Sequence, residues 1–241
     1  MIQFFAPDIE STLTLPESDS QHCIRVLRKS VGDVIDVIDG KGNRFSCQII
    51  DAHAKHTSVE ILSKEALPLY WHNRIALGVA PTKHLDRMEW MTEKITEIGV
   101  NSITPLLCRW SERKEIKTER LTKIAVAAMK QSLKAYCPEI NPMTPVKKFI
   151  ESVKDYSQKF IAHCDDSTPR YLLSHIYKAN EDVAILIGPE GDFTPDEVKA
   201  AIDAGFTPIS LGDARLRTET AAVVACDTCH IINQMTSHSN S

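Results

Sequence analysis

The sequence LIGPEGDFTPDEV, at Leu186–Val198, shows how one strand of this chain passes into a helix. The apolar run Val183–Ile187 predicts a buried strand, which a turn rich in glycine follows. Thr194 is a suitable N-cap, Pro195 fits the first helical position, and Glu197 completes a capping box. The segment therefore predicts an α/β unit with its loop at the carboxyl edge of a sheet, where open α/β sheets bind ligands.

A second loop of this kind lies in LGDARLRTETAA, at Leu211–Ala222. A strand is expected over Pro208–Leu211 and a helix over Glu219–Gln234, for which Thr218 is a candidate N-cap. Arg217 has no such structural explanation, because the positive end of a helix dipole disfavours a cation. We therefore expect Arg217 to meet a carboxylate of a substrate or cofactor, or a nucleic-acid phosphate.

Strands and helices alternate from Arg74 onward, which predicts a mostly parallel sheet with helices on both faces. Further strands are expected at Ile75–Val79, Ser102–Leu107 and Lys159–His163. Helices are expected at Leu85–Ile98, ended by Gly99, at Thr118–Ala135, near Pro169–Tyr177 and at Pro195–Ala204.

The chain up to about Leu67 is predicted to be mainly β, with a hairpin around the turn Asp39–Asn43. Its strands are expected at Val34–Ile38, Arg44–Ile50 and Thr57–Leu62, and a basic helix is expected at His22–Lys29. The segment Leu67-Pro68-Leu69 breaks this pattern. We therefore expect two domains, a small β domain over residues 1–68 and an α/β domain over residues 69–241.

The composition narrows the class of protein. The chain has 241 residues, 43% hydrophobic content and a net charge of -4, which argues against nonspecific coating of nucleic acid but allows local basic patches. It has no membrane-length apolar run and no signal-peptide pattern, and its seven cysteines are scattered, so we expect a cytoplasmic protein with reduced thiols. Cys226 and Cys229 form a CxxC inside a helical run without further zinc ligands; we expect them to pack in the core, and we expect no metal.

Several catalytic motifs are absent. The sequence has no GxGxxG after the first α/β strand, no phosphate-binding P-loop, no GxSxG nucleophile elbow and no HExxH. A dinucleotide oxidoreductase, a P-loop NTPase and a serine hydrolase are therefore disfavoured.

A basic cluster surrounds the start of the helix expected at Thr118. Its members are Arg109, Arg113, Lys114, Lys117, Arg120, Lys123, Lys130 and Lys134. Glu112, Glu115 and Glu119 lie among them, so a solvated helix face explains the cluster as well as RNA contact does.

The two loops together resemble the bacterial 16S rRNA (uracil-N3)-methyltransferase family of the SPOUT superfamily. Other matching residues are Lys83, Arg87, Glu89, Glu97-Ile98-Gly99-Val100, Pro105, Arg109, Arg120, Gln131-Ser132 and Pro138. The amino-terminal part matches a PUA-type RNA-binding domain at Val26-Leu27-Arg28, Gly32-Asp33 and Asp39–Gly42.

The resemblance implies a SPOUT-type parallel sheet with a carboxyl-terminal trefoil knot, a homodimer, and methylation of N3 of a uridine in 16S rRNA or the small ribosomal subunit. It implies S-adenosyl-L-methionine as cofactor, held by Ile187, Gly188, Pro189, Glu190, Gly191, Leu211, Gly212, Leu216, Arg217, Thr220 and Ala221. A β-branched residue at Gly191 is expected to abolish cofactor binding by steric conflict. RNA contacts are expected from Arg25, Arg28, Lys29, Arg109, Arg113, Arg120, Lys130 and Lys134.

For catalysis, we expect Arg217 to stabilise the anion that uridine N3 forms and Glu219 to accept its proton, although Glu219 equally suits a helix N-terminus. The chain departs from the family at Asp192, which replaces a glycine, at Ala214-Arg215 and at Gln3, often an arginine. Two other functions stay open: a noncatalytic RNA-binding or ribosome-assembly protein that retains the cofactor fold, and an α/β enzyme for another nucleotide-like ligand.

Overall fold

The computed structural model describes residues 2–164 and 168–238 and divides into two units. One unit contains the amino-terminal residues up to Tyr70 together with Val126–Cys137, and the other contains Trp71–Ala125 and the chain from Pro138 onward. The division therefore falls inside one helix, α4 (Thr118–Gln131), whose second half belongs to the amino-terminal unit. The sequence offered no sign of this assignment, because α4 reads as one continuous amphipathic helix.

The amino-terminal unit is a four-stranded sheet in the order β1-β2-β3-β4, in which β1 pairs parallel to β2 and the other pairs are antiparallel. The strands are β1 (Gln3–Phe5), β2 (Val34–Ile38), β3 (Asn43–Asp51) and β4 (Ser58–Ala66). The hairpin expected around Asp39–Asn43 is present, and Phe4, Val37, Phe45 and Ile49 lie in its core. Met129 and Ala135, from the Val126–Cys137 segment, pack against Ile38.

The basic helix expected at His22–Lys29 begins and ends earlier than predicted. The short helices α1 (Ile9–Thr12) and α2 (Glu17–Gln21) precede it, and α2 continues as a π-helical turn, η1 (His22–Val26). Arg28 then has a φ of 55°, a left-handed conformation that stops the helix.

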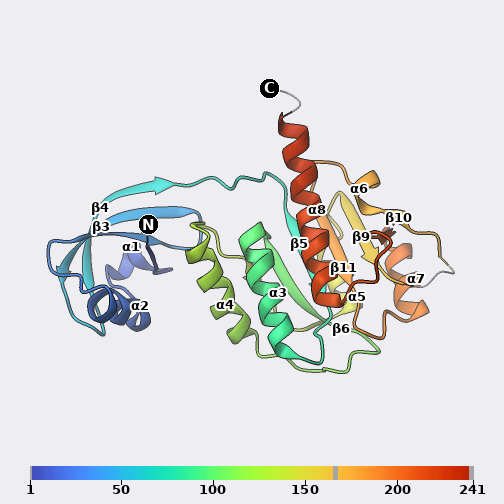
Figure 1. Cartoon of the computed structure of the whole chain (residues 1–241), viewed down its shortest axis with the longest axis horizontal. Helices are drawn as coiled ribbons and strands as arrows, with labels where there is room; N and C mark the ends of the chain where they lie inside the picture. Colours follow the sequence, from blue (N-terminus) through green and yellow to red (C-terminus); the bar gives the residue numbers. More distant parts are fainter. Residues whose placement is uncertain (1, 165–167, 239–241) are drawn as a thin grey trace. The chain divides into compact units, whose positions relative to one another are not determined.

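The carboxyl-terminal unit is built on a parallel sheet in the order β10-β12-β9-β11-β5-β6-β7, with β8 beside β6 (Figure 1). Its strands are β5 (Ile75–Val79), β6 (Ser102–Leu107), β7 (Glu139–Ile140), β8 (Thr144–Pro145), β9 (Gln158–Ala162), β10 (Tyr171–Leu172), β11 (Val183–Ile187) and β12 (Thr207–Ser210). The central strands β5 and β11 are buried along their whole length, as a parallel sheet covered on both faces requires.

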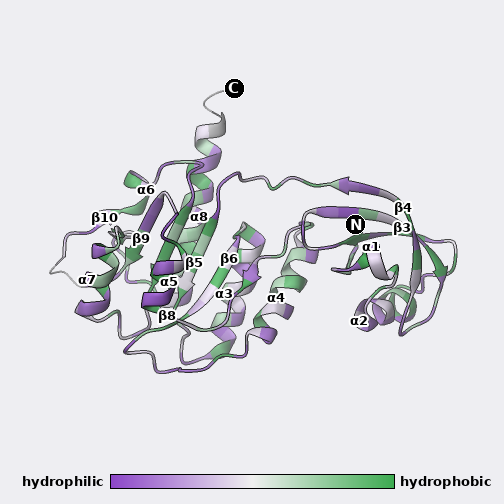
Figure 2. Cartoon of the chain, turned by 180° about the vertical axis from the view of Figure 1, so that it is seen from behind, coloured by the Kyte–Doolittle hydropathy of each residue, from purple (hydrophilic) through white to green (hydrophobic). Residues whose placement is uncertain are grey.

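Helices cover both faces of this sheet, as expected. The helices α3 (Leu85–Ile98), α6 (Leu173–Ile176) and α8 (Thr218–His238) pack together on one face, and α5 (Val146–Ser152) packs with α7 (Pro195–Asp203) on the other. Figure 2 shows strongly hydrophobic central strands and helices of mixed colour, so the helices bury one side each. The segment expected to be helical near Pro169–Tyr177 instead begins as β10, which pairs with β12.

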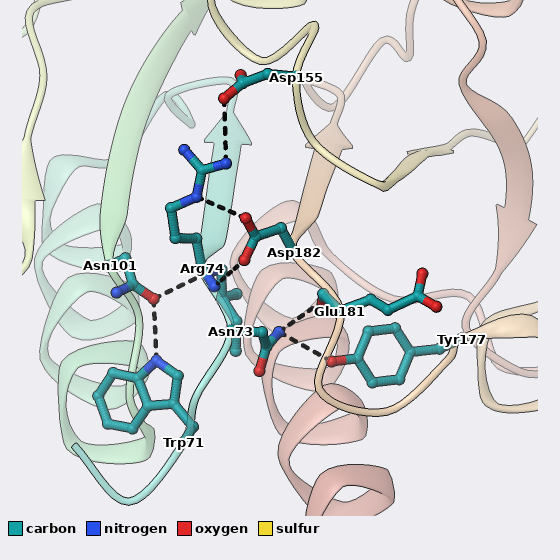
Figure 3. Close-up of polar contacts among 9 residues, drawn as sticks. Trp71, Asn73, Arg74, Asn101, Asp155, Tyr177, Glu181 and Asp182 are labelled. Atoms are coloured by element: carbon teal, nitrogen blue, oxygen red, sulfur yellow. Dashed lines mark hydrogen bonds and ion pairs between the residues drawn. The ribbon is translucent and has the colours of Figure 1, made fainter. Parts of the chain in front are cut away.

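An ion-pair cluster fixes the amino ends of the two central strands (Figure 3). Arg74, directly before β5, places its Nε 2.7 Å from Asp182 and its Nη2 3.1 Å from Asp155. Its backbone N–H donates to Asp182 at 2.6 Å. Because Asp182 directly precedes β11, these contacts set the register of two strands that are far apart in the sequence.

A second group of hydrogen bonds lies beside this cluster. The Asn101 side-chain oxygen accepts from Trp71 Nε1 at 3.0 Å and from the Ile75 N–H at 2.9 Å. Asn73 donates to the Tyr177 hydroxyl at 3.1 Å (Figure 3). That hydroxyl donates to Asn233 of α8 at 3.0 Å. These buried polar groups are thus satisfied and attach α8 to this edge of the sheet.

Cys226 and Cys229 lie in the core, on the buried side of α8. Burial raises the pKa of the Cys229 thiol to about 12 and also raises that of Cys226. The Cys226 thiol donates to the Gly99 carbonyl at 3.2 Å. Both thiols are therefore unreactive packing groups, as the sequence predicts.

Candidate functional site at the carboxyl edge of the parallel sheet

A pocket opens at the carboxyl ends of β9, β11 and β12, between the two loops that the sequence singles out. Seven of the residues expected to hold a cofactor line it: Ile187, Gly188, Pro189, Leu211, Gly212, Leu216 and Ala221. Four others, Glu190, Gly191, Arg217 and Thr220, lie in the same two loops or at the start of α8 but are not part of the lining.

Thr218 connects the two loops. Its hydroxyl donates to the Gly188 carbonyl at 3.0 Å, and the residue is buried. The expectation that Thr218 is the N-cap of this helix was wrong, because α8 begins at Thr218 itself and the carbonyl of the preceding Arg217 accepts from the Ala221 N–H at 2.8 Å. Loss of the Thr218 hydroxyl would leave a buried carbonyl without its hydrogen-bond donor, so Thr218 holds the pocket in shape.

The pocket also contains residues that the sequence analysis missed. From β9 and the loop after it come Ala162, His163, Cys164 and Arg170. Ile209 and Ser210 come from β12, Asp192, Ala214 and Arg215 from the two loops, and Thr218 from the start of α8. Arg170 donates to the His163 carbonyl at 2.8 Å. No motif in the segment after β9 marks it as part of a site, and only its position beside β11 in the sheet places it there.

Asp192, one of the departures expected from the family resemblance, has a left-handed backbone with a φ of 67°. Its carboxylate accepts from the Phe193 N–H at 2.8 Å and from the Cys164 N–H at 2.7 Å. It therefore stabilises the unusual turn and joins the loop after β11 to the loop after β9. The departure from the family pattern is thus accommodated by the fold.

The loop after β11 also holds the loops that follow β5 and β6. Glu190 accepts from the Lys83 N–H at 3.1 Å, and Glu197 accepts from the Arg109 N–H at 2.8 Å. Glu197 at the same time completes the expected capping box with Thr194. Two acidic side chains, one from the loop after β11 and one from the first turn of α7, therefore fix the neighbouring loops at this edge of the sheet.

Arg217 and Glu219 differ sharply in their surroundings. Arg217 is exposed, and the described part of the chain provides no partner for its guanidinium group. Glu219 is 7% exposed, its Oε1 lies 3.7 Å from Arg87 Nε, and its Oε2 has no hydrogen-bond partner among the described residues. The start of α8 thus presents a free cation and a buried carboxylate that retains one unused acceptor.

The basic residues expected to contact RNA fall into two sets. Arg25, Arg28 and Arg109 are exposed, and no described residue pairs with their side chains. The side chains of the second set have partners or are half-buried. Arg120 pairs with Glu89 at 2.5 Å, and Lys130 pairs with Asp19 at 2.5 Å. Arg113 donates to the Lys83 carbonyl, Lys134 lies over the Tyr70 ring, and Lys29 is half-buried. Gln3, the departure at the amino end, is buried and faces the interior.

Within residues 2–164 and 168–238, no helix combines the length and apolarity needed to cross a membrane. No group of three or more His, Cys, Asp or Glu side chains there is arranged to hold a metal ion.

The fold is that of an α/β RNA methyltransferase, and the family models match accordingly. The RNA methyltransferase domain model matches residues 70–230, and the RNA methyltransferase PUA domain model matches residues 15–62. The chain belongs to this RNA methyltransferase family.

Individual proteins that resemble this chain carry methyltransferase names as well. The chain is 30% identical to ribosomal RNA small subunit methyltransferase E of Rickettsia conorii over 217 residues, which cover 89% of this chain and 88% of the relative. A crystal structure of a probable rRNA-methyltransferase from Porphyromonas gingivalis is 43% identical, with a TM-score of 0.93 over 98% of this chain and 100% of that one. A Legionella pneumophila methyltransferase, crystallised with bound SAM, is 28% identical, with a TM-score of 0.85 over 96% and 97% of the two chains.

Proposed function

We propose that the protein methylates N3 of a uridine in 16S rRNA of the small ribosomal subunit, in the cytoplasm, with S-adenosyl-L-methionine as methyl donor. The observation that carries this proposal is the pocket that the two family loops form together, joined by the hydrogen bond from Thr218 to Gly188. In this proposal residues 1–68 bind RNA, and residues 69–241 carry the catalytic site and the trefoil knot that the resemblance implies.

The residues of the pocket suit this cofactor chemically. Ile187, Ile209 and Leu216 provide apolar walls for an adenine ring, whose polar edge the loop backbone groups would recognise. Arg215 would pair with the carboxylate of the cofactor, and Asp192 would face its positive charges. The bound cofactor supplies a methyl group that its sulfonium already activates, so the chain needs to orient and deprotonate the base.

Arg217 and Glu219 would carry the chemistry on the RNA. Uridine N3 is a weak acid, so its reaction needs a proton acceptor or a cation that stabilises the developing anion. The exposed guanidinium of Arg217 is free to approach such an anion. The unused Oε2 of Glu219 is free to accept a hydrogen bond or a proton, while Arg87 holds Oε1.

The position of the methyl group tests this function directly. Labelled S-adenosyl-L-methionine and small ribosomal subunits that lack the modification are expected to yield N3-methyluridine in nucleoside mass spectrometry. Label on a ribose, on a purine or on the protein would overturn the assignment. Cofactor binding without methyl transfer to rRNA would favour an RNA-binding or assembly role, and no cofactor binding would favour an enzyme for another ligand.

The amino-terminal unit is proposed to contact phosphates through the segment Arg25–Lys29. Changing Arg28 and Lys29 together to Ala is expected to weaken RNA binding about tenfold and to lower the slope of log affinity against log salt by about 1.5–2, because two phosphate contacts are lost. The matched control changes Lys147 and Lys148, two exposed lysines of α5, to Ala. Equal losses in the two double variants would show a general charge effect and contradict a local contact.

We also propose that the protein is a homodimer assembled through its catalytic unit. The helix α8 buries Ala222, Ala225 and Cys229 on one side, yet Ile231 and Met235 are exposed on it. A helix that is apolar on more than one side needs a partner surface as well as its own core. Light scattering at micromolar concentration is expected to give twice the chain mass of 27.0 kDa, and the mass of a single chain would refute the dimer.

A further inference from the structure

Trp110 stands on the loop between β6 and α4 with 51% of its surface exposed. The residues on either side of it are fixed. Ser111 is buried, and its hydroxyl accepts from the Cys108 N–H at 3.1 Å, while the Ser111 N–H donates to the Cys108 carbonyl at 3.2 Å. With the bond from the Arg109 N–H to Glu197, these contacts make a closed turn that holds a large apolar ring in solvent.

The turn that carries Trp110 lies against the glycine-rich loop of the candidate site. A Cβ atom placed on Gly191 would lie 3.5 Å from the Cβ atom of Trp110. The loop between β5 and α3 is hydrogen-bonded to both of these loops. The Lys83 N–H donates to Glu190, and the Lys83 carbonyl accepts from Arg113 at 2.9 Å. The exposed indole is therefore a fixed part of the surface beside the pocket.

Exposed basic residues lie on the loop that carries Trp110 and on the Lys83 loop that is hydrogen-bonded to it. Arg109, the neighbour of Trp110 in the sequence, is exposed, and within residues 2–164 and 168–238 its guanidinium has no partner. Lys83, Lys114 and Lys117 are exposed on the same two loops. Lys83 also pairs with Glu112 at 3.6 Å, whereas the Arg109 guanidinium remains available. An exposed aromatic face beside such a cation is the combination with which proteins bind unstacked nucleobases and their phosphates, since every base offers a face for stacking.

We propose that Trp110 is a stacking platform for a nucleobase of the RNA substrate next to the target uridine, with Arg109 pairing with its phosphate. This inference rests on the proposed function, because it assumes that RNA enters at this edge of the sheet. Enzymes that modify a base must take it out of its stack, which costs stacking free energy. An aromatic ring that stacks on a neighbouring base recovers part of this free energy.

The test compares Trp110→Ala and Trp110→Phe with Trp90→Ala, which removes another tryptophan of the same unit, 45% exposed on α3. Binding of unmodified 16S rRNA is measured by filter retention, binding of S-adenosylhomocysteine by calorimetry, and mass by light scattering. Trp110→Ala is expected to lower rRNA affinity about tenfold, Trp110→Phe less than threefold and Trp90→Ala not at all, because stacking needs an aromatic face at position 110. Cofactor affinity and mass are expected to stay unchanged in both Trp110 variants.

Ultraviolet crosslinking gives a direct readout. Trypsin cleaves after Arg109 and Arg113, so a base stacked on the indole is expected to add a nucleotide to the peptide Trp110–Arg113. If the wild type binds and methylates rRNA and Trp110→Ala binds rRNA with the same affinity, the stacking role alone is overturned. A change of mass in Trp110→Ala would assign the indole to contact with a second copy, and a wild-type protein that does not bind rRNA would overturn both this inference and the proposed function.

Discussion

Changing Arg217 to Ala is expected to lower the rate of methyl transfer by about two to three orders of magnitude, the usual effect of removing one group that stabilises a developing anion. The guanidinium is exposed at the start of α8 and has no partner in the described part of the chain, so its removal breaks no contact of the fold. Single-turnover measurements with saturating cofactor and small ribosomal subunits would give this rate.

Two further measurements separate this role from a simple contribution to binding. Arg217→Lys keeps the charge and is expected to recover part of the rate, and the affinity of Arg217→Ala for rRNA is expected to stay within about threefold of the wild type. A variant that binds rRNA poorly but reacts at the wild-type rate once saturated would make Arg217 a phosphate contact and not a catalytic residue.

Changing Gly188 to Val is expected to lower the affinity for S-adenosyl-L-methionine about a hundredfold. A Cβ atom there would lie 3.1 Å from the Phe193 ring and 3.3 Å from the Asp192 carboxylate, so the loop has to move, and overpacking of this kind costs about 3 kcal/mol. Gly188 lines the pocket, and its carbonyl accepts a hydrogen bond from the Thr218 hydroxyl. A shift of the loop therefore changes the shape of the pocket and disturbs this hydrogen bond. Calorimetry measures the affinity, and thermal unfolding reports whether the variant stays folded.

Gly191→Val is the matched control, and it tests the sequence-based expectation that a β-branched residue at Gly191 abolishes cofactor binding. Its Cβ atom would have ordinary contact with Trp110 at 3.5 Å, and the residue does not line the pocket. Cofactor affinity within about threefold of the wild type is expected. If both variants lost the cofactor equally, the pocket assigned here would not be the binding site.

Local patterns in the sequence were sufficient to predict most of the α/β unit. The strand Val183–Ile187 and the helix Leu85–Ile98 have the predicted bounds, and the capping box of Thr194 and Glu197 is formed. These features depend on residues a few positions apart. The short strands β7 and β8 were missed, because two-residue strands leave no periodic pattern.

The parts of the site that the sequence did not reveal depend on contacts between distant segments. Thr218 looks like a helix cap until Gly188 is placed beside it, and Cys164 enters the pocket only because β9 lies next to β11. The pairing of Lys130 with Asp19 likewise joins residues far apart in the chain, so the sequence suggested a free cation. The sequence thus predicted which two loops line the pocket but not which side chains from other segments line it with them.

The pairing of β5 with β11, secured by Arg74 and Asp182, has a consequence for the order of folding. The two residues are 108 positions apart, so a nascent chain that has already formed β5 and β6 still exposes one edge of β5 until Asp182 has been made. Contacts between residues so far apart in the sequence form slowly, because the chain between them loses conformational entropy before the contact contributes any stabilisation. The central part of this sheet is therefore completed late in synthesis, and the candidate pocket, which depends on the end of β11, forms later still.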